Sequence, residues 1–114
     1  MIKSAVVSIL LLFSADAAAD ADRQGQFQQG TDTLSVCVTF SLKEVHPELR
    51  LNLHVGEPMT LIAMTDATEE SKLWTIEFGE KQTGVADVIL HNVKATAADL
   101  DAVWRTVEDC AKQN

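Results

Sequence analysis

Residues 96–112 read TAADLDAVWRTVEDCAK, and their apolar side chains recur at intervals of three and four positions. That spacing lines up one face of an α-helix: Leu100, Val103, Trp104, Val107 and Ala111. Thr96 precedes Asp99 by three residues, which is the arrangement of a helix N-cap followed by a first-turn acid. The pattern predicts an amphipathic helix over Ala97–Lys112, with Cys110 at the edge of its apolar face.

Strand-like alternation dominates the chain before this helix. In residues 33–42, apolar side chains such as Val36, Val38 and Phe40 alternate with small polar ones, as in a half-buried β-strand. We therefore expect a first strand over Thr33–Leu42, with Cys37 on its less apolar face. Further strands are expected over four apolar segments that glycine, proline and polar residues separate: 49–55, 59–64, 73–78 and 85–93.

The fold class follows from the need of each apolar strand or helix face to be buried against another element. Strands followed by one helix predict an α+β domain with a small, mainly antiparallel sheet of four to five strands and one C-terminal amphipathic helix. The only two cysteines, Cys37 and Cys110, lie 73 residues apart, and we expect a single disulfide between them to clamp the helix to the first strand.

The N-terminal segment has the parts of a secretory signal peptide. Lys3 precedes an uncharged apolar run, residues 5–13, which is followed by small residues at alternating positions. This run is far shorter than the about 20 residues that a membrane-spanning helix needs. Cleavage sites of the right type end at Ala17, Ala19 and Ala21, and the last two are preferred.

The expected organisation is therefore a signal peptide over residues 1–21, a flexible lead-in over 22–32 and a single domain over 33–114. The mature protein is expected to be periplasmic or secreted, without a membrane span. An oxidising compartment favours the disulfide over two buried thiols, and a redox pair would normally have the Cys-x-x-Cys spacing that is absent here.

Composition excludes several classes of function. Hydrophobic residues make up 46% of the 114 residues and charged residues 23%, which is too apolar for a disordered chain. The net charge of -8 argues against binding to nucleic acid or to anionic membrane surfaces, because both attract basic proteins.

No nucleophile elbow or glycine-rich phosphate loop is present, so we expect no enzyme and no catalytic residue. His46, His54 and His91 lack metal-ligand spacing, and we expect no metal or other cofactor.

The function that these observations favour is that of a small exported acidic binding module. We expect an inhibitor or immunity-type protein that acts on a basic protein partner in the bacterial cell envelope. Its expected contact residues lie in predicted turns and loops: Glu57, Asp66, Glu69, Glu70, Glu80 and Lys81. The same residues could instead serve only solubility. The alternatives are an accessory subunit of an envelope assembly, docking through an apolar sheet face, and a small enzyme or carrier with a deep pocket. The partner and the oligomeric state stay open.

Overall fold

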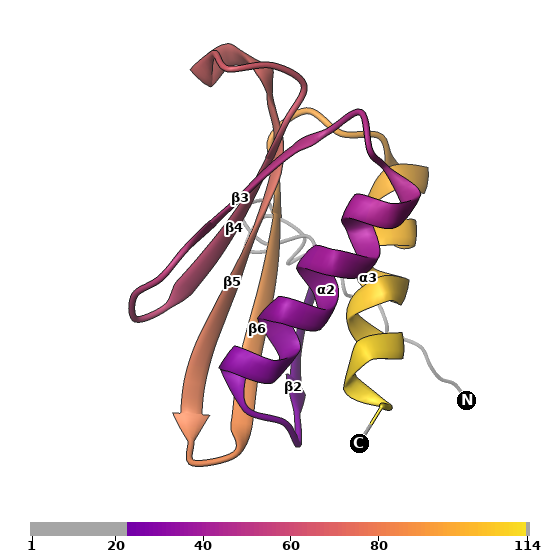
Figure 1. Ribbon diagram of the computed structural model, residues 1–114. Coiled ribbons are helices and arrows are strands. Elements are labelled where there is room, and N and C mark those ends of the chain that lie inside the picture. Colours follow the sequence, from indigo (N-terminus) through magenta and orange to yellow (C-terminus); the bar gives the residue numbers. More distant parts are fainter. Residues whose placement is uncertain (1–22, 114) are drawn as a thin grey trace, which may run out of the picture.

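The computed structural model describes residues 23–113, which form an α+β fold with one sheet covered on a single face by two helices (Figure 1). Its strands and helices follow one another in this order: β2 (Arg23–Phe27), α2 (Thr31–Val45), β3 (Arg50–His54), β4 (Met59–Met64), the short 3-10 helix η3 (Glu69–Ser71), β5 (Lys72–Gln82), β6 (Val85–Asn92) and α3 (Ala97–Ala111).

The five strands form one antiparallel sheet in the order β2-β6-β5-β4-β3. In the middle of the sheet, Ile76 of β5 stands opposite Leu61 of β4 on one side and Leu90 of β6 on the other. The predicted fold class is confirmed, and the four strands expected after residue 48 lie in β3, β4, β5 and β6. The predicted C-terminal helix is α3, in which the Thr96 hydroxyl accepts a 3.1 Å hydrogen bond from the Asp99 amide.

The strand expected over Thr33–Leu42 is wrong, because this segment lies inside helix α2. Leu34, Val38 and Leu42 are spaced by four residues, so they satisfy a period of two and a helical face equally well. Exposure separates the two arrangements. These three side chains are buried, whereas Val36 and Phe40 between them are 45% and 66% exposed.

The segment expected as a lead-in supplies the fifth strand. Residues Arg23–Phe27 form β2, which pairs with β6 along an unbroken register from Arg23 opposite Leu90 to Phe27 opposite Ala86. The Phe27 and Trp104 ring centroids lie 5.9 Å apart, which ties the strand to α3. A Cβ atom at Gly25 would approach the Trp104 ring to 3.2 Å, so glycine permits this close packing. Part of the expected lead-in thus belongs to the sheet, and the predicted signal peptide lies outside the described residues.

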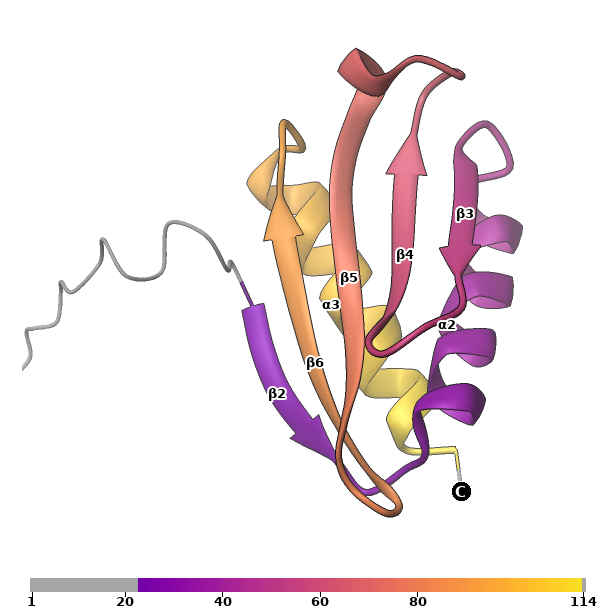
Figure 2. The same ribbon diagram turned by 90° about the vertical axis from the view of Figure 1, so that its left-hand side faces the viewer.

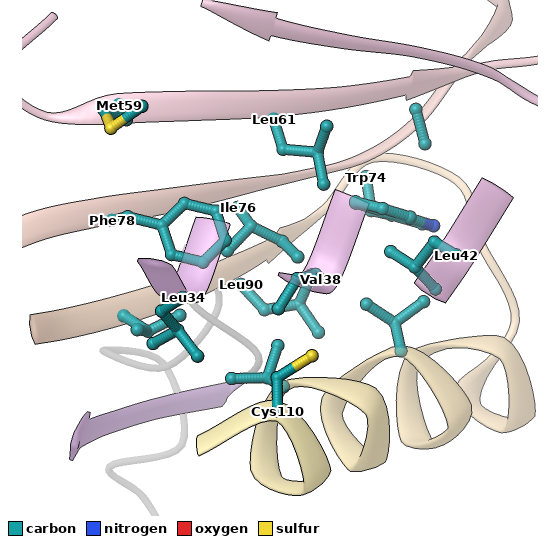
Figure 3. Packing of buried hydrophobic residues seen from close by; sticks show 14 of the residues in the cluster. Leu34, Val38, Leu42, Met59, Leu61, Trp74, Ile76, Phe78, Leu90 and Cys110 are labelled. Atoms are coloured by element: carbon teal, nitrogen blue, oxygen red, sulfur yellow. The ribbon is translucent and has the colours of Figure 1, made fainter. Parts of the chain in front are cut away.

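The core lies between the sheet and the two helices (Figure 3). Trp74, Ile76 and Phe78 of β5 point into it and meet Leu34, Val38 and Leu42 of α2. Full burial of a large apolar side chain contributes about 1.5–3 kcal/mol, so this cluster is the main source of folding free energy.

The predicted disulfide between Cys37 and Cys110 is confirmed, with a Cα–Cα separation of 5.9 Å. It joins α2 to α3 rather than a strand to the C-terminal helix, because Cys37 lies on a helix. The bond therefore holds together the two elements that cover the sheet. Both helices lie on the same side of the sheet, and no helix of residues 23–113 covers its other face (Figure 2); we call this other face the open face.

Candidate partner-binding site

The six predicted contact residues divide into two groups at opposite ends of the sheet (Figure 2). Glu57 lies in the turn between β3 and β4, and Glu80 and Lys81 lie near the end of β5. The other three residues, Asp66, Glu69 and Glu70, lie in the connection between β4 and β5. Strand β5 has 11 residues, which corresponds to roughly 35 Å in extended form, so the two groups cannot line one pocket.

The first group lines a hollow of about 420 Å³ together with residues of the open face. We call it the acidic hollow, and its lining consists of Glu57, Pro58, Glu77, Gly79, Glu80, Lys81, Asp87 and Ile89. Glu77 and Asp87 reach it because they alternate along their strands with buried residues such as Phe78 and Val88. A turn and two strands thus contribute to one surface depression.

Hydrogen bonding and pairing hold the acidic hollow in shape. The Glu57 carboxylate accepts a hydrogen bond of 3.2 Å from the backbone amide of Glu80, which ties the β3–β4 turn to β5. Across the ladder between β5 and β6, Glu77 stands opposite Ile89 and Gly79 stands opposite Asp87. Because Gly79 has no side chain, the space between Asp87 and Pro58 stays open. These contacts preform the hollow before any partner arrives.

The charge of the acidic hollow is strongly negative. Among the lining residues that the structure describes, four are carboxylates and Lys81 alone is cationic. The Oδ1 atom of Asp87 is buried and has no hydrogen-bond partner among the described residues. The arrangement suits an ammonium or guanidinium group from a partner.

Two residues of the second predicted group, Asp66 and Glu69, make contacts within their own loop, whereas Glu70 is exposed. Asp66 Oδ1 accepts hydrogen bonds from the Thr68 amide at 2.8 Å and the Thr68 hydroxyl at 2.7 Å. Glu69 forms an ion pair of 2.8 Å with Lys72. These contacts give Asp66 and Glu69 a local structural role, and partner binding by either of them stays a prediction.

Asp66 provides a direct test of this loop geometry. The hydrogen bonds from the Thr68 amide and hydroxyl lower the pKa of the Asp66 carboxyl below its ordinary value of 3.8, since they favour the charged form. A depressed pKa in the folded state means that the loop is stabilised above the unfolded-state pKa and loses this stabilisation as pH falls through the folded-state pKa. We expect NMR titration to show this lowered pKa, and Thr68→Ala to bring it back toward 3.8. An Asp66 pKa at or above 3.8 would contradict these hydrogen bonds.

Glu77 and Asp87 are not among the contact residues predicted from the sequence, because those predictions are confined to turns and loops. The alternation of buried and less buried residues along β5 and β6 nevertheless indicates their position. It places both carboxylates on the face of the sheet that is turned away from the core. Their proximity to Glu57 could not be read from the sequence, since it depends on the order of the strands.

The histidines lie in separate parts of the fold. His46 Nδ1 is 3.3 Å from a Glu48 carboxylate oxygen, His54 ends the edge strand β3, and His91 Nε2 is 3.6 Å from a Glu77 oxygen. Within residues 23–113, no three side chains of His, Cys, Asp or Glu are grouped as metal ligands. None of the helices in that range is long and apolar enough to cross a bilayer.

Comparison with protein-family models found no match for this chain. A search of curated proteins found no relative either.

Proposed function

We propose that this protein is an exported acidic binding module, an inhibitor or immunity-type protein, that holds a basic side chain of a protein partner in the acidic hollow. The observation that carries the proposal is the convergence of Glu57, Glu77, Glu80 and Asp87 on one preformed depression. A lysine or arginine placed there would gain charge-assisted hydrogen bonds, which contribute about 1.5–3 kcal/mol each.

Rigidity supports a binding role for the open face. The acidic hollow is built on β5 and β6, whose other face carries the buried core residues Phe78 and Val88. The Cys37–Cys110 bond fixes the two helices behind this sheet. A preformed site loses little conformational entropy on binding, so more of the interaction free energy appears as affinity.

The cell envelope is the proposed location. Support comes from the signal-like N-terminal segment and from the disulfide, which is typical of oxidising compartments. A mature chain that starts at Asp22 has 8 basic and 15 acidic side chains, and its net charge of -7 would also speed the encounter with a basic partner at low ionic strength.

Affinity capture from an envelope extract tests this function. Mature protein starting at Asp22 serves as bait, beside the hollow variant Glu77→Gln/Asp87→Asn and the loop variant Glu69→Gln/Glu70→Gln. Both variants remove two negative charges, but only the first alters the acidic hollow. We expect one basic protein at stoichiometric yield, whose affinity falls at least tenfold with the hollow variant and with rising salt.

The loop variant should bind the captured protein as well as the unmodified bait does. Equal losses in both variants would show that net charge alone governs capture and would overturn the assigned site. Recovery of an acidic partner, or of none, would overturn the proposed function. Thermal unfolding of both variants checks that each is folded.

An accessory subunit of an envelope assembly is the second candidate, and one observation favours it. Val36 and Phe40 lie one helical turn apart on the outer face of α2 and are both exposed. That hypothesis expects an apolar sheet face to dock, but the open face is both apolar and polar. Ile62 pairs with Thr75, and Ile89 pairs with Glu77. Capture of assembly components that Phe40→Ala abolishes would favour this second function.

A further inference from the structure

We propose that a hollow at one end of the core, between the end of α2 and the start of α3, binds a small neutral molecule. The ligand has an apolar body and one oxygen atom that accepts a hydrogen bond. This second site does not depend on the acidic hollow, because the two share no lining residue.

The hollow has a volume of about 150 Å³, and we call it the Trp74 hollow. Its apolar lining consists of Leu49, Leu73, Trp74 and Val103. Its polar lining consists of His46, Glu48 and Asp99. A cavity of roughly this volume holds a molecule of the size of benzene, so the ligand is a small ring or a short branched chain.

Ordered elements form the walls of the Trp74 hollow. His46 ends α2, and its carbonyl accepts a 3.1 Å hydrogen bond from the Leu49 amide, which fixes the start of the connection to β3. Trp74 lies in β5, and Asp99 and Val103 lie in the first two turns of α3. The space therefore exists before a ligand enters it.

The indole N–H of Trp74 is the group that selects the ligand. The Trp74 side chain is 1% exposed, and Figure 3 shows its nitrogen turned away from Ile76 and Phe78. Within residues 23–113 this N–H forms no hydrogen bond, and its nitrogen is not among the unpaired polar atoms sealed from solvent. Since Trp74 lines the Trp74 hollow, the N–H opens into that space. Buried tryptophans usually find a hydrogen-bond partner for this group, and a ligand oxygen would supply one.

The lining determines the chemical class of the ligand. An ammonium group cannot accept a hydrogen bond from the Trp74 N–H. Glu48 and Asp99 are exposed at the mouth of the hollow, and their carboxylates disfavour an anion. His46 Nδ1 lies 3.3 Å from a Glu48 oxygen, so a charged His46 would offset one of these carboxylates and leave the other. A neutral alcohol or ketone with a small hydrocarbon body meets every condition, and its apolar part gains from burial.

NMR titration of the mature protein with cyclopentanol tests the site. We expect the indole proton of Trp74 to move downfield and to saturate, because hydrogen bonding to the hydroxyl oxygen deshields it. The dissociation constant should be on the order of 1 mM, as for other ligands of this size. Trp104 is the internal control, since its ring packs against Phe27 and does not line the Trp74 hollow. Cyclopentane has no acceptor and should not move the Trp74 proton downfield.

Two matched variants separate the hydrogen bond from apolar burial. Trp74→Phe removes the donor and keeps an aromatic ring, and Trp104→Phe makes the same change outside the Trp74 hollow. We expect Trp74→Phe to weaken cyclopentanol binding about fivefold more than cyclopentane binding, which is the effect of one neutral hydrogen bond. Trp104→Phe should leave both affinities within about twofold. Binding to the variants is followed by the backbone amides of Leu49 and Val103, and thermal unfolding checks that each variant is folded.

Cyclopentylammonium and cyclopentanecarboxylate should each bind more weakly than cyclopentanol. The absence of a saturable shift with cyclopentanol would overturn the proposal, as would a downfield shift of Trp104 in place of Trp74 or tighter binding of either charged probe. The variant Glu77→Gln/Asp87→Asn of the acidic hollow should bind cyclopentanol as well as the unmodified protein does. Failure of this inference and failure of the proposed function can therefore be told apart.

Discussion

Replacing Cys37 and Cys110 together by alanine is expected to lower the free energy of unfolding by about 4 kcal/mol. The bond closes a loop with a sequence separation of 73 residues, and its loss returns to the unfolded chain the freedom that the cross-link removes. Small domains have a total stability of about 5–15 kcal/mol, so this one bond accounts for a large fraction of it. The midpoint of thermal unfolding should fall by on the order of 20 °C.

Urea unfolding of the oxidised protein and of the double variant measures this difference. Ser41→Ala is the control, since the Ser41 hydroxyl lies 3.7 Å from Cys110 Sγ and its removal changes the same region without opening the loop. That control should change the stability by less than about 1 kcal/mol. A double variant as stable as the control would contradict the role assigned to the disulfide.

Leu42→Ala is expected to lower the free energy of unfolding by about 2–5 kcal/mol, because Leu42 is buried between α2 and the sheet. Phe40→Ala, two residues earlier, should change it by less than about 0.5 kcal/mol, since the Phe40 side chain is 66% exposed. A strand would place both residues on one face, so the pair of variants separates a helix from a strand. Urea unfolding of both variants provides the measurement, and equal losses would contradict helix α2.

The sequence pattern alone correctly predicts helix α3 and the strands β3 to β6, but it does not predict helix α2. Val36, Val38 and Thr39 are β-branched, and β-branched residues are common in strands. Local preference and alternation therefore both predict a strand where the structure has a helix. The decisive constraint is tertiary. Five strands about 4.8 Å apart form a sheet roughly 20 Å wide, and one helix of about 10 Å diameter cannot cover it. A second helix is needed, and α2 provides it.

The candidate site could be predicted in part for a similar reason. Turn chemistry located Glu57, Glu80 and Lys81, and the strand order then brought them together at one end of the sheet. Because β4 and β5 run antiparallel, the connection between them lies at the other end of the sheet, with Asp66 and the neighbouring glutamates. Which connections share an end depends on strand direction and pairing, which spacing along the sequence does not fix.

The most direct test of the whole account is the intact mass of the natural protein, isolated from the cell envelope fraction and treated with an alkylating reagent before any reduction. Export and oxidation together predict a chain that starts at Asp20 or Asp22, is lighter than its reduced form by two hydrogen atoms and takes up no alkyl group. A chain that still starts at Met1 and is alkylated on both Cys37 and Cys110 would contradict the disulfide, the location and the proposed role in the envelope.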